Sequence, residues 1–158
     1  MLNVGDKVFI PIFGAGIVYI VENKIIADKD SVFIGIKLLL GNMSLIIPIN
    51  KVKDYKLRNV ETIEKAEKCL KIIATEPTII EKKWSKRYRQ SNEKITEGNL
   101  EKECEVLRDL YFLKKKGGIP PGEYKIFNKV LHLVASEISL IFDITISDAC
   151  RKIENFAR

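Results

Sequence analysis

The stretch PPGEYKIFNKVLHLVASEISLI, residues 120–141, carries the strongest periodicity in this chain. Apolar side chains recur in it every three or four residues for about four turns, which predicts a helix with one face in a core. Its two leading prolines suit a helix start, because a first turn leaves the backbone N–H groups unpaired in any case. We expect this helix to be the spine of its domain. The predicted core face is Phe127, Val130, Leu131, Val134, Ile138 and Ile141.

Helical periodicity extends on both sides of this spine, from Asn59 onward. Three further segments have an apolar stripe, whereas residues 81–97 have few apolar positions and many charges. Gly98 and Gly117-Gly118 are natural helix ends, because glycine readily adopts the left-handed conformation found there. We therefore predict about five helices. The other stripes are Ile63, Ala66, Leu70 and Ile73, then Leu100, Cys104, Leu107 and Tyr111, and finally Ala149, Ile153 and Phe156 after the capping-box pattern Thr145-x-x-Asp148.

The first 57 residues have another pattern, of short β-branched and apolar runs separated by Gly, Asn and Asp. Five short strands in so few residues predict a small antiparallel β-barrel of the SH3-like or Tudor-like type. The predicted class is α+β, with the barrel at 1–57 and an all-helical domain at 58–158. The junction 56–61 is short and lacks Gly and Pro, so we expect a packed interface. The candidate strands are residues 7–11, 16–21, 32–39, 45–48 and 52–56.

Pro48 gives the run Leu45-Ile46-Ile47-Pro48 a special position in the predicted barrel. Proline has no N–H to donate to a ladder, so within sheets it is found at edges and strand ends. An apolar edge without charges tends to aggregate unless something covers it. Two covers are equally compatible with the residues: a strand added by another protein, or the second domain of this chain.

The positive charge of the chain is concentrated in one short window. The net charge is +6, and the window 82–89 alone carries +5, because it holds five basic residues and no acidic one. It also contains the only tryptophan, Trp84. Lysine and arginine bind phosphates, and a flat aromatic side chain among them can stack on a base or wedge into a minor groove. The alternative is a core tryptophan beside a solvated basic face, and the residue types alone leave both open.

Residues for catalysis or metal binding are scarce. His132, the only histidine, lies between two leucines of the spine, which favours a structural role. The three cysteines (Cys69, Cys104 and Cys150) are far apart and have no partners at metal-ligand spacing, so we expect core thiols and no metal, cofactor or disulfide. No phosphate loop, nucleophile elbow or zinc-protease motif is present. We predict that the protein is not an enzyme and takes no small-molecule substrate.

Two further expectations concern the acidic residues and the location of the protein. Glu97, Glu101, Glu103 and Glu105 alternate with basic residues, which predicts an exposed, salt-bridged helix face. The N-terminal residues lack a basic segment followed by an apolar core, and no apolar run approaches the roughly 20 residues that span a bilayer. We therefore expect a cytoplasmic protein without membrane contact.

Several motifs together resemble a known family over nearly the whole chain. In the barrel they are Val4-Gly5-Asp6-Lys7-Val8, Pro11-x-x-Gly14-Ala15-Gly16, Asn42-Met43-Ser44 and Ile47-Pro48. In the helical part they are Trp84-Ser85-Lys86-Arg87-Tyr88 and Glu105-Val106-Leu107-Arg108-Asp109-Leu110. In this order and spacing they resemble the CarD/CdnL family of bacterial transcription regulators, whose barrel is similar to the polymerase-interacting domain of transcription-repair coupling factors.

The resemblance implies two partners, the β1-lobe of the RNA polymerase β subunit and promoter DNA near the upstream −10 fork. It implies that the barrel edge pairs with the β1-lobe and that Trp84 wedges into the minor groove, which would stabilise the open complex. A monomer associated with the nucleoid through polymerase is expected. The implied polymerase-binding residues are Lys24, Leu45, Ile46, Ile47 and Pro48, and the implied DNA-binding residues are Trp84, Lys83, Lys86, Arg87, Arg89 and Lys125.

Two positions depart from the family pattern. Ile46 stands where some members have arginine, and Tyr124 replaces a basic residue, although Lys125 follows it directly. Both departures bear on affinity for polymerase and DNA. Two other functions stay open from the residues alone: a protein interaction module without DNA contact, and an RNA- or ribosome-associated factor, since such barrels serve several functions.

Overall fold

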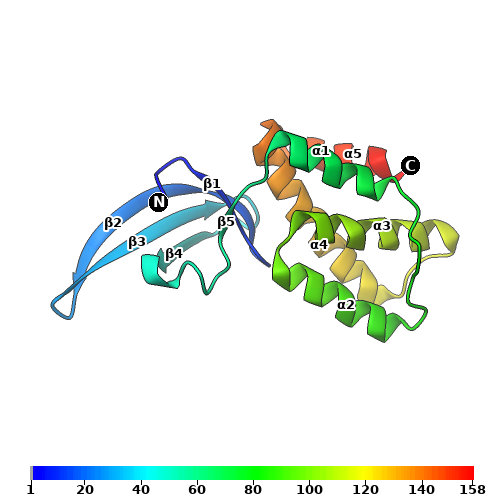
Figure 1. The fold of residues 1–158 in the computed structure, drawn as a ribbon, viewed down its shortest axis with the longest axis horizontal. Coiled ribbons are helices and arrows are strands. Elements are labelled where there is room, and N and C mark those ends of the chain that lie inside the picture. The colour runs from blue at the N-terminus through cyan, green and yellow to red at the C-terminus, as the bar shows by residue number, and fades with distance from the viewer. Residues whose placement is uncertain (1) are drawn as a thin grey trace.

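The computed structural model describes residues 2–158, which form a β-sheet unit followed by a helical unit (Figure 1). The sheet is antiparallel with the strand order β4-β3-β2-β1-β5. Together with the helices that follow, it gives the predicted α+β fold. The strands are β1 (Lys7–Ile10), β2 (Gly14–Ile26), β3 (Lys29–Leu38), β4 (Ser44–Pro48) and β5 (Arg58–Asn59), and the 3₁₀ turn η1 (Ile49–Lys51) follows β4.

The β2–β3 pair is longer than the sequence predicted and forms a hairpin that extends far from the helices (Figure 1). The fifth predicted strand, at 52–56, is wrong. These residues form turns, closed by bonds such as Asp54 N to Lys51 O at 3.0 Å, and Lys56 has a left-handed φ of 57°. The true fifth strand is β5, where Phe9 of β1 pairs with Arg58. The sheet therefore continues past residue 57.

The two faces of the sheet are used differently. In β3, Ile34 and Ile36 are fully buried on the inner face, whereas Lys37 is exposed on the outer one, as the period of two requires. In β1, Phe9 points away from this core and packs with the helices. The strand unit thus has a core of its own, and part of its other face packs against the helical unit. Its core is Val8, Ile10, Val18, Ile34, Ile36, Leu38 and Ile47.

The helical unit contains the five helices that the periodicity predicted. Local side chains set several of their ends: Thr145 accepts a hydrogen bond from the Asp148 backbone, and Gly98 ends its helix with a left-handed φ of 71°. Among residues 2–158 no single helix is long and apolar enough to cross a membrane; only the pair α4 and α5, bent by 109°, passes by length and composition. The helices are α1 (Ile63–Ile73), α2 (Trp84–Glu97), α3 (Leu100–Lys116), α4 (Pro121–Phe142) and α5 (Ile146–Ala157).

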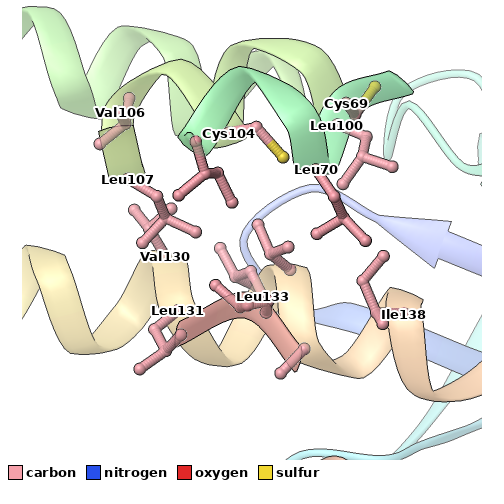
Figure 2. Close-up of a cluster of buried hydrophobic side chains, with 14 of the residues drawn as sticks. Cys69, Leu70, Leu100, Cys104, Val106, Leu107, Val130, Leu131, Leu133 and Ile138 are labelled. Atoms are coloured by element: carbon pink, nitrogen blue, oxygen red, sulfur yellow. The ribbon is translucent and has the colours of Figure 1, made fainter. Parts of the chain in front are cut away.

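Helix α4 is the spine of this unit, as predicted. Its central residues are buried on nearly all sides, and Figure 2 shows Val130 on the side of α4 that faces Leu107 of α3, with Leu131 on another side of the helix. A helix buried all round packs between other elements rather than on their surface. Here α1, α3 and α5 cover it together with part of α2, and the sheet meets its C-terminal half.

Polar bonds join the sheet to α4 and confirm the expected packed interface. The backbone N–H of Ala15 donates to Ser136 Oγ at 3.0 Å, and Lys7 Nζ donates to the carbonyl of Leu140 at 2.9 Å. Arg58 of β5 also crosses to this helix, where it binds Glu137. Because these groups are specific and partly buried, the two units hold one orientation rather than hanging on a free tether.

Candidate nucleic-acid interface and sheet edge

Trp84 stands at the first position of α2, with 48% of its surface exposed. One side of its indole is supported. Tyr88 meets it edge to face with ring centroids 6.3 Å apart, and the ring lies close to Gly122 of α4, where an added Cβ would be 3.5 Å from it. The interpretation of Trp84 as a core residue is therefore wrong. The Trp84 side chain packs against Tyr88 and Gly122 on one side and is exposed to solvent on the other.

Arg87 lies one turn after Trp84 and ties α2 to α4. Its Nε donates to Glu123 Oε2 at 2.8 Å, Nη2 bonds the other carboxylate oxygen, and Nη1 donates to the Glu81 carbonyl at 2.8 Å. The Glu123 side chain is fully buried and that of Arg87 is 12% exposed. The sequence indicated Arg87 as a DNA-facing cation. In the structure its guanidinium has partners within the protein, and these bonds hold the start of α2, where Trp84 lies, against α4.

The other basic residues of the window are exposed around Trp84. Lys86 forms a weak ion pair with Glu81 at 3.5 Å, and half of its side chain is exposed to solvent. A phosphate can therefore take the place of Glu81 as its partner. Lys125 is exposed on α4, next to Tyr124. Lys114 Nζ lies over the ring of Tyr124, 5.6 Å from its centroid, in a cation–π contact. We call the exposed set the Trp84 patch; it consists of Lys82, Lys83, Trp84, Lys86, Arg89 and Lys125.

Strand β4 lies at one edge of the sheet, with β3 on its only paired side among the described strands. The free edge predicted from Pro48 is therefore confirmed. Ile46 is 60% exposed on the outer face, Ile47 is buried inward, and Leu45 and Pro48 are half-buried. The outward side of this strand thus offers both apolar contact and unpaired backbone groups, which is the surface that an added strand uses. Among residues 2–158, the helices pack on β2 rather than on β4.

Lys24 lies on the outer face of β2, two strands away from β4. Its Nζ is 5.8 Å from the centroid of Phe33, and Phe33 is the register partner of Pro48. The fold therefore brings Lys24 and the β4 edge to the same part of the sheet. It also adds two residues that the sequence did not indicate: Tyr19 and Ile20 are exposed and cover Gly35, which pairs with Ile46. A β-bulge between Val18 and Ile20 turns them outward, and no local motif marks it.

Comparison with known proteins identifies the family of this chain. Residues 68–154, more than half of the chain, match the family CarD, C-terminal domain. The chain belongs to the CarD family. It is accordingly a transcription regulator, and the matched region contains α2, α3, α4 and most of α5. A Bacillus subtilis (strain 168) protein named "Putative transcription factor YdeB" is 28% identical over 145 residues, which are 92% of this chain and 95% of that protein. That similarity extends to the sheet.

The acidic residues of this CarD-family chain do not all lie on an exposed face, so that prediction is wrong for Glu103. Glu103 is completely buried on α3, and neither of its carboxylate oxygens has a hydrogen-bond partner among the described residues. Burial raises its pKa to about 8, the nearby Glu137 carboxylate adds to the rise, and Arg58 opposes it. The other three form salt bridges with lysines as predicted, although Glu105 is half-buried: Glu97 pairs with Lys102, Glu101 with Lys65, and Glu105 with Lys94.

The histidine and the cysteines have structural environments. His132 is exposed on α4, and its Nδ1 bonds the Asn128 carbonyl at 2.7 Å. Cys69 and Cys104 are buried in the helical core, as predicted, whereas Cys150 is half-buried at its edge. Burial raises the pKa of the Cys69 thiol to about 11, so it stays protonated at neutral pH. In residues 2–158, no cluster of three His, Cys, Asp or Glu side chains could hold a metal ion.

Proposed function

We propose that this protein binds the β subunit of RNA polymerase through its β-sheet unit and stabilises the open promoter complex through the helical unit that follows. In this proposal the β4 edge adds to a strand of the β1-lobe, and Lys24 contacts the same partner. Trp84 enters the minor groove at the upstream fork, with Lys83, Lys86, Arg89 and Lys125 on the flanking phosphates. The carrying observation is that the only tryptophan is held firmly yet half exposed among exposed cations.

The packing around Trp84 supports its proposed role as a wedge in the minor groove. A side chain that separates bases must not fold back onto its own protein when it meets the duplex. The edge contact with Tyr88 and the close approach to Gly122 support the indole from behind, and the Arg87–Glu123 pair fixes the helix that carries it. A preorganised side chain loses less conformational entropy on binding, so more of the contact energy is available to stabilise melted DNA.

The rigid connection between the two units supports a tethered mechanism. Because the sheet is bonded to α4 and α2 is bonded to α4, the position of the β4 edge determines the position of Trp84. A polymerase-bound factor needs only modest DNA affinity, since tethering raises its local concentration. Only the difference in affinity between melted and closed DNA shifts their equilibrium, and about 1.4 kcal/mol changes it tenfold.

The test is the lifetime of an open complex formed by polymerase holoenzyme from the source bacterium. Wild-type protein should lengthen it, and Trp84→Ala should lose this effect while still binding polymerase. Lys24→Glu should weaken polymerase binding itself. Tyr55→Ala is a matched control, because Tyr55 is a similarly exposed aromatic residue in the turns after η1 and belongs to neither proposed surface. An unchanged lifetime with wild type bound to polymerase would exclude the DNA contact.

A second candidate function is a protein interaction module without DNA contact. One face of the sheet has exposed apolar side chains, Tyr19, Ile20 and Ile46, which favour protein binding by that unit. These side chains do not require a DNA contact. This function leaves the +5 window around Trp84 without a role. An RNA- or ribosome-associated factor is the third alternative. Co-purification with ribosomes instead of polymerase would support it.

A further inference from the structure

A groove of about 240 Å³ opens between α2 and α4 beside the Trp84 patch. Tyr88 and Asn92 line it from α2, Ile126 and two lysines line it from α4, and Ile12 from the turn after β1 closes its far end. Sites for drug-sized ligands are about 300–1,000 Å³ in volume. This groove therefore suits a smaller flat group.

The groove begins one helical turn from Trp84. Tyr88 is both the edge-to-face neighbour of the Trp84 indole and a wall of the groove, and it is 38% exposed. A base that loses its stacking partner because Trp84 takes its place would meet the Tyr88 ring next. Aromatic side chains stack on bases of any sequence, because every base has a π-face.

The charges and polar groups at the groove match a nucleotide. Lys125 and Lys129 stand exposed at its α4 side, and none of the described residues that line it is acidic. Cations at the rim of an apolar pocket place phosphates outside and a base inside. Asn92 is exposed in the wall, and its amide offers one donor group and one acceptor, which is what a base edge requires.

Ile12 has an unusual conformation at the end of the groove. Its φ is 75°, a left-handed value that β-branched residues rarely adopt, and its side chain is 45% exposed. The neighbouring Pro11 packs so tightly on Gly98 that an added Cβ there would lie 2.3 Å from the Pro11 ring. The contact between the two units thus holds Ile12 in a strained position that contributes nothing to a core. Such strain is typical of ligand-binding sites.

We infer that this groove receives one unpaired base of the strand that Trp84 separates, with the base against Tyr88 and Ile12 and its phosphates near Lys125 and Lys129. The inference rests on the proposed function and deepens it. A wedge alone opens the stack, whereas a wedge with a pocket also holds the displaced base, which lengthens the life of the open state.

The test is the affinity of the full-length chain for forked DNA, measured by fluorescence anisotropy at low salt, with one abasic site moved through the positions next to the fork on each strand. Wild type should lose on the order of tenfold in affinity when one particular base is missing, and little at the other positions. Asn92→Leu should bind the complete fork more weakly and should lose much of the sensitivity to that position. Asn128→Leu changes an exposed asparagine of α4 that does not line the groove, and it should behave as wild type.

The outcomes separate the groove from the wedge. Equal affinity at all abasic positions, with binding that still depends on Trp84, would overturn the groove proposal and leave the proposed function intact. No binding of any fork, alone or on polymerase, would overturn both. A flat abasic profile together with weaker polymerase binding by Asn92→Leu would make the groove a protein-docking site, which also contradicts the inference.

Discussion

Arg58 and Glu137 lie 79 residues apart in sequence, and the guanidinium of Arg58 donates to both carboxylate oxygens of Glu137 at 2.6 and 2.7 Å. Glu137 is fully buried in α4, and Arg58 is 24% exposed on β5. Arg58 also donates to the Gly98 carbonyl at the end of α2 and lies over the ring of Phe9, 4.5 Å from its centroid. One side chain thus joins the sheet, α2 and α4.

Arg58→Met should destabilise the protein by about 3–5 kcal/mol, because it leaves the buried Glu137 carboxylate without a counter-charge. The double variant Arg58→Met/Glu137→Leu should recover much of this loss. Urea unfolding followed by circular dichroism measures both. Lys102→Met, which breaks an exposed bridge to Glu97, is the control and should change little. A double variant no more stable than the single one would show that the buried charge is not the cause.

Glu103 should make stability fall as the pH rises. Its pKa in the folded chain is about 8, above the ordinary value of 4.5, so the folded state binds the proton more tightly than the unfolded state. The contribution of this group is complete below pH 4.5 and is lost as the pH rises to about 8. Glu103→Gln, which cannot ionise, should therefore gain roughly 2–4 kcal/mol relative to wild type between pH 5 and pH 9.

Thermal unfolding of both proteins across this range tests that difference. Glu101→Gln is the control, because Glu101 is exposed on the same helix and pairs with Lys65 at the surface. Parallel pH profiles for Glu103→Gln and wild type would mean that a water or a rearrangement satisfies the carboxylate.

Arg87→Lys should loosen the start of α2 although it keeps the charge. A lysine ammonium cannot reproduce the two-point contact with Glu123, so the loss should be about 1–3 kcal/mol. Trp84 is the only tryptophan, and its fluorescence reports the position directly: emission should shift to the red and its anisotropy should fall. Arg89→Lys, an exposed arginine two residues away, should leave the spectrum unchanged. Identical spectra for both variants would argue against a positioning role for Arg87.

Ile46→Asp should weaken polymerase binding roughly tenfold, about 1.4 kcal/mol, because it places a charge on the outer face of the β4 edge. Folding should be unaffected, since Ile46 is 60% exposed. Ile63→Asp is the matched control, an isoleucine 54% exposed at the first turn of α1. Pull-down or interferometry with the polymerase β subunit measures the effect. Equal binding by both variants would remove β4 from the interface.

Much of the fold follows from the sequence, and so do the cluster of Trp84 with its lysines and the β4 edge, because these features depend on residues that are neighbours in the chain. The helix period of α4, the cap at Thr145 and the free edge at Pro48 are local patterns, and the structure has all three. Trp84 and its lysines are likewise adjacent in sequence, so their clustering is visible without a structure. The exceptions at this level are residues 52–56, whose apolar content resembles a strand but whose backbone makes turns.

Tertiary structure alone decided which charges are available and which are engaged. Arg87 and Lys86 look alike in sequence, yet only Arg87 meets a buried carboxylate, from a residue 36 positions away. Glu103 looks like its exposed neighbours, yet its position on α3 faces the core. Periodicity records which side of an element is apolar, but a pair such as Arg58 and Glu137 forms only after packing brings distant elements together and removes water from between them. The sequence therefore determined the helices, most of the strands and the basic window. The packing determined the Arg58–Glu137 pair, the buried Glu103 and the groove beside Trp84.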